Sequence, residues 1–491
     1  MLAYLDTYAN HTDDRLETME KYYTAGYIKD TDFCFDMLAE YKNADELTAE
    51  QKNRRTEILT NLAANGIYVG GLPDVAENAA VMAEVIETAF SYQNSFEYAE
   101  MLAKMRVGVT NGTNIADSVG TGITYQLVSQ AVEKALEAPE DFVWSYIAVM
   151  FYNNQEQHSL YLTADYSDDK RILAVVENFE KQFEKQLGKD ITKEERLGIK
   201  KLVMQTYLRA LALDKCADYG LEALKEFDNF FIRENTMYAL LKTGRYDECL
   251  KLAKEVQDDT NPVPLYYAAA ATLESGEFDA SAEYVLKLAK QVRTSEYPKK
   301  ADELLHSYFS LLVVDTETTK AKYSILSDEQ INKLNSDEFL KNYLAAYVNA
   351  CYPSYGDHSI YDDAYTQAME TALAAVDRVI SERGELCYPY YLKGVTFMQQ
   401  KKYDEAVAAY KKAIDYKSDD PMIWYALYAA YEELEEWENA YTAAEIAIGL
   451  SPWFNYYSDY EGIGIHPYSY RDGAKAMIEK QHEASQKGGN E

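Results

Sequence analysis

The side chains that most often catalyse reactions or hold metal ions are few and scattered in this sequence. None of the six histidines lies three or four residues from another, the spacing that places two imidazoles on one helix face to bind zinc. The densest group of possible ligands is GDHSIYDDAY, with Asp357, His358, Asp362 and Asp363. Acidic side chains and Ser359 also favour the start of a helix. We therefore interpret this group as a helix cap, with a metal site as the alternative.

A glycine-rich stretch, VGVTNGTNIADSVGTGITYQ, has some of the character of a phosphate-binding loop. No lysine follows its glycines, and Asp117 would repel a phosphate. We predict a connecting loop before a helix that includes YQLVSQAVEKAL. With no grouping of a nucleophile, a base and an orienting side chain, the sequence predicts a non-catalytic protein that needs no cofactor and no metal ion.

The charge balance narrows the class of partner. The chain has 48 basic and 82 acidic side chains and a formal net charge of -34. Such an excess repels a phosphate backbone, so nucleic acid is not an expected partner. It agrees instead with good solubility or with attraction of a basic partner.

Cysteines and apolar runs bear on the location of the protein. The five cysteines are far apart and form no C-x-x-C pair, so we expect buried free thiols. No apolar run is long enough to span a bilayer, and the opening residues MLAYLDTYANHTDDR do not resemble a secretory signal. The expected location is the cytoplasm, or the soluble part of a membrane-anchored or exported protein. The 45 tyrosines favour a cell-envelope origin.

The elements that would position a functional surface are helices. Of 491 residues only 10 are proline and 22 are glycine, and alanine, leucine, glutamate and lysine dominate long windows, so an all-α fold is predicted. A period of 34 residues runs through the C-terminal part. Tyr403 and Ala406 fall on Trp437 and Ala440, and Tyr390 falls on Trp424.

This pattern resembles the tetratricopeptide repeat family, in which each repeat is a helical hairpin. Residues 387–420 and 421–454 match the family pattern of aromatic and small residues, except that Tyr428 stands at a small position and Ala444 at an aromatic one. Moderate matches lie at 204–295, where Phe278 follows Tyr246 by 32 residues. The resemblance implies an α-solenoid of stacked hairpins, because one hairpin alone cannot bury its apolar face.

The chain is therefore expected to divide into successive helical regions. Residues 1–200 read as helices without a clear period, either as degenerate repeats or as a separate domain. Hairpins like those of the family follow at 201–298, and an irregular helical segment at 299–386 includes helices near 299–314, 336–350 and 362–383. Two full repeats at 387–454 precede a capping helix and a frayed tail at 455–491.

By the same resemblance, certain positions of each first helix line a concave groove. These positions are aromatic, apolar or acidic, with scarcely a cation among them. We therefore expect a non-catalytic scaffold that binds a basic and apolar peptide or protein. The predicted partner-binding residues are Tyr388, Tyr391, Met398, Met422, Tyr425, Glu432, Glu433 and Tyr266.

Two alternatives stay open at this point. Residues 1–200 could form a helical enzyme or a small-molecule-binding domain, with the repeats as its targeting arm. The chain could also be a cell-envelope protein that binds glycan or a partner enzyme through exposed tyrosine and tryptophan.

Overall fold

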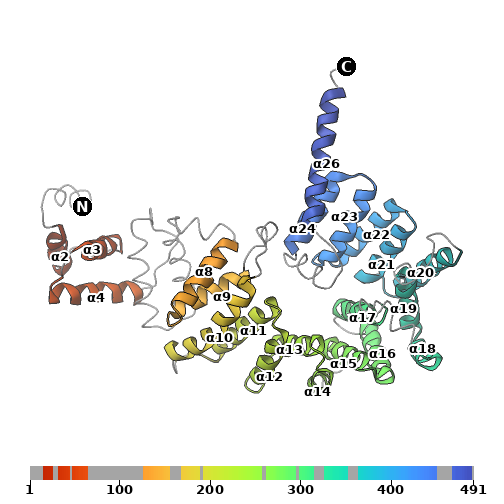
Figure 1. Ribbon diagram of the computed structural model, residues 1–491, viewed down its shortest axis with the longest axis horizontal. Coiled ribbons are helices and arrows are strands. Elements are labelled where there is room, and N and C mark those ends of the chain that lie inside the picture. Colours follow the sequence, from red (N-terminus) through yellow and green to blue (C-terminus); the bar gives the residue numbers. More distant parts are fainter. Residues whose placement is uncertain are drawn as a thin grey trace. The chain divides into compact units, whose positions relative to one another are not determined.

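The computed structural model describes residues 15–25, 31–44, 47–64, 125–154, 167–187, 192–256, 261–294, 298–313, 326–351, 363–450 and 467–488. Within these ranges every regular element is an α-helix, which confirms the all-α prediction (Figure 1). The chain forms two compact units, Met1–Ala212 and Leu213–Glu491. None of the described helices combines the length and apolar character that a bilayer crossing requires. The glycine-rich stretch before Tyr125 and all of GDHSIYDDAY before Asp363 lie outside the described residues.

The first unit contains two sets of helices. The first set is α2 (Arg15–Thr24), α3 (Thr31–Asn43) and α4 (Ala49–Ala64), and the second is α8 (Tyr125–Glu137), α9 (Phe142–Asn154), α10 (Ser167–Leu187) and α11 (Lys193–Arg209). Helix α9 has apolar residues on all sides and packs against α8, α10 and α11, so it forms the centre of the second set. Phe142 stacks on Phe179 with ring centroids 5.6 Å apart.

The second unit is a succession of hairpins in which consecutive helices pack together, except for α18, which packs on α16. Its first part is α12 (Leu213–Ala223), α13 (Phe230–Lys242), α14 (Tyr246–Lys254), α15 (Pro262–Glu274), α16 (Phe278–Thr294) and α17 (Pro298–Val313). Its second part is α18 (Asp328–Leu334), α19 (Glu338–Ala350), α20 (Asp363–Glu382), α21 (Cys387–Gln399), α22 (Tyr403–Tyr416), α23 (Pro421–Glu433), α24 (Trp437–Leu450) and α26 (Pro467–Gly488). Helices α17, α19 and α20 confirm the three helices expected near 299–314, 336–350 and 362–383.

Alternate helices form a continuous layer. Besides packing on its hairpin partner, α13 contacts α15, α15 contacts α17, α17 contacts α21 and α21 contacts α23. We call these five helices the A layer. This pattern of contacts, in which each hairpin stacks on its neighbours, is that of an α-solenoid. Helix α17 touches α21 directly, so the A layer continues across the irregular segment between them.

The hairpins share one turn geometry. The residue in the left-handed conformation is Gly244 after α13, Gly276 after α15, Lys401 after α21 and Glu435 after α23. In each turn the next residue's N–H donates to a carbonyl five residues back, for example Lys402 N to Phe397 O at 2.9 Å. This is the Schellman ending, which satisfies carbonyls at the helix end and starts the return helix after one residue.

The two C-terminal hairpins share one core. Gly394 on α21 faces the ring of Tyr410 on α22, and a Cβ added to the glycine would lie 2.5 Å from the tyrosine Cδ1. Tyr428 and Ala444, the residues 34 positions later, lie buried in the same cluster as Tyr410. Ala474 of α26 also belongs to this cluster, so α26 covers the end of the last hairpin.

All five cysteines are free thiols, as expected. Four are buried, whereas Cys351, at the C-terminal end of α19, is half-buried, which corrects the expectation of burial for that residue. Cys351 is the C-cap residue of α19, just beyond the last helical turn. Burial raises the pKa of Cys216 and of Cys249 to about 12, so these thiols stay protonated and unreactive at neutral pH.

Candidate binding surface

All predicted partner-binding residues lie on helices of the A layer. Helix α21 supplies three of them and the adjacent α23 supplies four, so these seven residues share one part of the layer. Tyr266 is on α15, which is separated from α21 by α17. The Tyr266 ring packs against Tyr267, with centroids 5.0 Å apart. The structure therefore brings together the residues of α21 and α23 and leaves Tyr266 apart from them.

Tyr388 is mostly covered. Only 6% of its surface is exposed, and its hydroxyl donates to Asp420 Oδ2 at 2.6 Å. Asp420 is the N-cap residue of α23, where its other oxygen accepts the Met422 N–H at 2.9 Å. Tyr388 thus joins α21 to the start of α23, and little of its ring is left for a ligand.

The other predicted residues on α21 and α23 are half-buried, except for Glu433, which is exposed. Tyr391, Met398 and Tyr425 pack against the core cluster. Tyr425 also stacks on Tyr428, with ring centroids 5.9 Å apart and an interplanar angle of 22°. Packing restricts the motion of these side chains, and each keeps part of its surface exposed.

The acidic part of this surface lies at the end of α23. Glu432 and Glu433 occupy the last turn, which contains no basic residue. Glu432 accepts a hydrogen bond from the Tyr428 hydroxyl at 2.8 Å, which holds its carboxylate in place. Because the C-terminal end of a helix already carries negative partial charge, two carboxylates there make a site that attracts cations.

A histidine beside these tyrosines was not among the predicted residues. The His306 ring of α17 stacks on the Tyr388 ring, with ring centroids 4.3 Å apart and an interplanar angle of 17°. It also contacts the rings of Tyr347 and Tyr391 edge-on, with centroid distances of 5.1 Å and 5.6 Å. Burial lowers the pKa of His306 to about 3, so the imidazole is neutral at ordinary pH. The sequence signal that could have drawn attention to it is the E-x-x-H spacing of Glu303 and His306.

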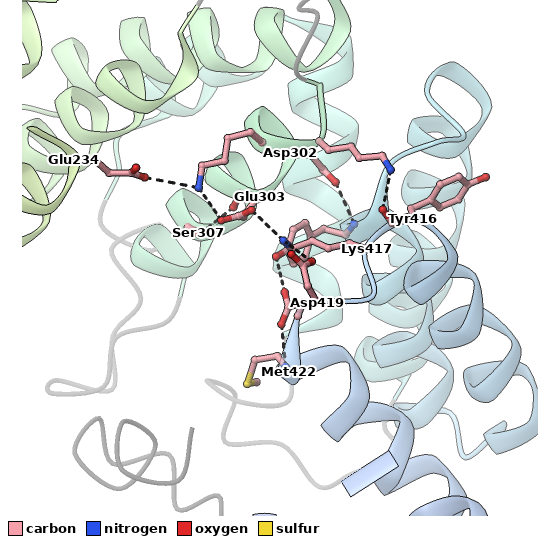
Figure 2. Close-up of polar contacts among 12 residues, drawn as sticks. Glu234, Asp302, Glu303, Ser307, Tyr416, Lys417, Asp419 and Met422 are labelled. Carbon is pink, nitrogen blue, oxygen red and sulfur yellow. Dashed lines mark hydrogen bonds and ion pairs between the residues drawn. The ribbon is translucent and has the colours of Figure 1, made fainter. Parts of the chain in front are cut away.

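Glu303 is engaged elsewhere, in a chain of ion pairs across the A layer (Figure 2). It lies 3.0 Å from Lys300 Nζ and 3.3 Å from Lys417 Nζ. Lys300 also reaches Glu234 of α13 at 3.8 Å, and Lys417 reaches Asp419 at 3.1 Å. Neither lysine was among the predicted partner-binding residues. Both are paired with carboxylates, so neither is a free anchor for an anionic ligand.

The candidate surface offers hydrogen bonds, apolar contact and negative charge. In the part of the chain that the structure describes, no group of three or more histidine, cysteine, aspartate or glutamate side chains is arranged to hold a metal ion.

Comparison with known proteins agrees with the helical pattern at this surface. Residues 394–434 match the family model described as TPR repeat. This part of the chain is a tetratricopeptide repeat. The matched residues begin at Gly394 in α21 and end at the residue after α23, so they include the predicted residues Met398, Met422, Tyr425, Glu432 and Glu433.

No curated protein matches the sequence. Among solved structures, the chain is similar to yeast Tom70, with 12% identity, a TM-score of 0.29 and coverage of 88% of this chain and 97% of that one. It is also similar to the TPR2AB domain of yeast Sti1 in a complex with pHSP90, with 14% identity, a TM-score of 0.22 and coverage of 57% and 99%. A third similar structure is the APC/C hetero-tetramer Cut9-Hcn1, with 10% identity, a TM-score of 0.23 and coverage of 94% and 92%. At such identities and scores, these similarities are no basis for assigning a ligand.

Proposed function

We propose that this chain is a non-catalytic protein-interaction scaffold. Its binding surface is formed by α21 and α23, and its partner is a peptide segment with basic and apolar side chains. The observation that carries the proposal is the juxtaposition of half-buried Tyr391, Met398 and Tyr425 with Glu432 and Glu433 on adjacent A-layer helices.

The aromatic part of this surface would supply most of the binding energy. Tyrosine is enriched among the residues that dominate interface energetics, because it buries a large area and loses little conformational entropy. Tyr391 and Tyr425 are already held by the core cluster, so binding would order them at little further cost. The carboxylates of Glu432 and Glu433 would steer a basic segment and set its direction on the surface.

The first experiment compares two double variants in affinity capture from the source cell. Tyr391→Ala with Tyr425→Ala should lose specific partners, because each truncation of an interface tyrosine is expected to cost about 1–2 kcal/mol. The control is Tyr390→Ala with Tyr416→Ala, which removes another stacked pair, with ring centroids 5.7 Å apart, from α21 and α22. The same partners on wild type and on the first variant would contradict the proposal.

The second experiment tests the charge preference with synthetic peptides of equal apolar content, one set rich in lysine and the other rich in glutamate. The lysine-rich set should bind more tightly, and its affinity should fall as salt is added. Glu432→Gln with Glu433→Gln should weaken this binding and flatten its salt dependence. The control is Asp404→Asn with Glu405→Gln, which removes two exposed charges from α22. Preference for the glutamate-rich set would contradict the acidic assignment.

A further inference from the structure

A fully buried carboxylate lies where α17, α19 and α21 meet. Asp302 of α17 has no exposed surface. Its Oδ1 accepts a hydrogen bond from the Tyr343 hydroxyl at 2.6 Å. Its Oδ2 accepts the backbone N–H of Tyr388 at 3.1 Å (Figure 2). Burial of a carboxylate is costly unless its oxygens are hydrogen-bonded, so these contacts are essential to its position.

Asp302 serves as the N-terminal cap of a helix to which it does not belong. The residue before α21 is Leu386, which makes no side-chain capping bond. By contrast, α15 and α23 are capped by Asn261 and Asp420, each accepting an N–H two residues later. In α21, however, the group that accepts the first-turn N–H of Tyr388 is the carboxylate of Asp302, 86 residues earlier in the chain. The first turn of α21 therefore depends on its contact with α17.

The groups around Asp302 determine how it responds to protons. Burial is the largest effect and raises the pKa of this carboxyl to about 7, against the lowering effect of its hydrogen bonds with Tyr343 and Tyr388. Burial also raises the pKa of the Cys387 thiol and of the Tyr343 and Tyr388 hydroxyls, so these neighbours stay neutral near pH 7. The charged groups nearby are Glu303, whose charge also raises the pKa of Asp302, and Lys417, Asp419 and Asp420 beside Cys387.

We propose that Asp302 is a proton-dependent clamp that holds the first turn of α21 against α17 and α19. In the ionised state both carboxylate oxygens accept, and an uncompensated charge is buried. When a proton from solvent binds to Oδ1, the Asp302 hydroxyl donates to the Tyr343 oxygen, while Oδ2 still accepts the Tyr388 N–H. A tyrosine hydroxyl can reverse its role in this way because it is both a donor and an acceptor.

The direction of the pH effect follows from proton linkage. The closed clamp binds the proton more tightly than the open state, in which Asp302 reaches water and recovers its ordinary pKa. The added stability is fully present below that ordinary pKa and is lost as pH rises through about 7. Opening of the first turn of α21 should therefore increase with pH, by up to about tenfold per unit below pH 7, and level off above it.

Hydrogen exchange followed by mass spectrometry on the full chain tests this clamp. Protection of residues 386–392, corrected for the intrinsic exchange rate, should fall from pH 5.5 to 7 and then level off. Asp302→Asn should show no such fall, because its amide can donate to the Tyr343 oxygen and accept from Tyr388 N–H at every pH. The internal control is the first turn of α15, residues 261–267, which is capped by its own Asn261.

Two results would overturn the clamp. One is a wild-type protection profile at α21 that rises with pH or parallels that of α15, which needs no variant to observe. The other is the same pH dependence in Asp302→Asn as in wild type. Asp420→Asn, the matched change at the other cap, should leave the pH profile of α21 intact. Neither measurement involves a partner, so the outcome is independent of the proposed binding function.

Discussion

The hairpins α21–α22 and α23–α24 fill the same core contact, but the large and the small residue stand on opposite helices. In the first, a glycine at 394 makes room for the ring of Tyr410, which is 2% exposed. In the second, the equivalent residues are Tyr428 and Ala444, so the large and the small side chain have exchanged helices. The two departures from the family pattern are therefore one compensated change. What the repeat conserves at this contact is the combined volume of two facing positions.

The largest effect is expected when the large side chain is removed from this contact in the first hairpin. Tyr410→Ala should lower the free energy of unfolding by about 3–5 kcal/mol, because it leaves a cavity beside Gly394 that the backbone cannot fill. Urea unfolding of the full chain, followed by tyrosine and tryptophan fluorescence, measures the loss. A loss below about 1 kcal/mol would mean that Tyr410 is not part of the core.

A second test places the large residue on α21 and the small residue on α22, as they are arranged in the second hairpin. Gly394→Tyr alone should destabilise by overpacking, since even a Cβ at this position collides with Tyr410. Combined with Tyr410→Ala, it should recover part of the lost stability, so the two effects are not additive. Additive losses in the same unfolding measurement would show that the positions do not exchange volume.

The helix caps give the next largest effect. Asp420→Ala removes the acceptor of both the Met422 N–H and the Tyr388 hydroxyl, and should cost about 2 kcal/mol. Asn261→Ala, at the same place in α15, removes only the acceptor of the Val263 N–H and should cost about 1 kcal/mol. Thermal unfolding of both variants tests the order. Equal losses would mean that the bond between Tyr388 and Asp420 contributes nothing.

The smallest effect concerns the left-handed turns, where the earlier hairpins use glycine and the later ones do not. Lys401→Gly should stabilise by about 0.5–1 kcal/mol, because a side chain with φ of 58° is strained there. Gly276→Ala should destabilise by about the same amount. No atom lies near its added Cβ, so the cost comes from the φ of 83° alone. The same sign for both changes in urea unfolding would contradict this account.

Local pattern predicted much of the second unit. The 34-residue period aligned Tyr403 with Trp437, and in the structure these two residues begin α22 and α24. Pro421, which follows the capping residue Asp420, likewise marks the start of α23. Such signals are readable because helix starts and hairpin contacts depend on residues close in sequence.

Contacts between distant residues left no such signal. Tyr388 was predicted to bind a partner from its position in the repeat. In the structure the His306 ring stacks on its ring, and Asp420 accepts the hydrogen bond of its hydroxyl. Asp302 stands in an ordinary helical pattern, and nothing near it in sequence indicates that it caps α21. These contacts depend on which helices pack against each other. A 34-residue period cannot predict that packing across an irregular segment, because the period is interrupted there.

The sequence by itself determined that this protein is built of helical hairpins, that residues 394–434 form a tetratricopeptide repeat, and that α21 and α23 carry tyrosines and glutamates. Only the tertiary structure decided that α17 packs directly on α21, and hence which of those side chains are buried and which face outward. The physical reason is the range of the forces involved. Hydrogen bonding and side-chain periodicity within a hairpin depend on residues that are close in sequence. The burial of a side chain depends on which other helix packs over it, and that helix can be distant in sequence.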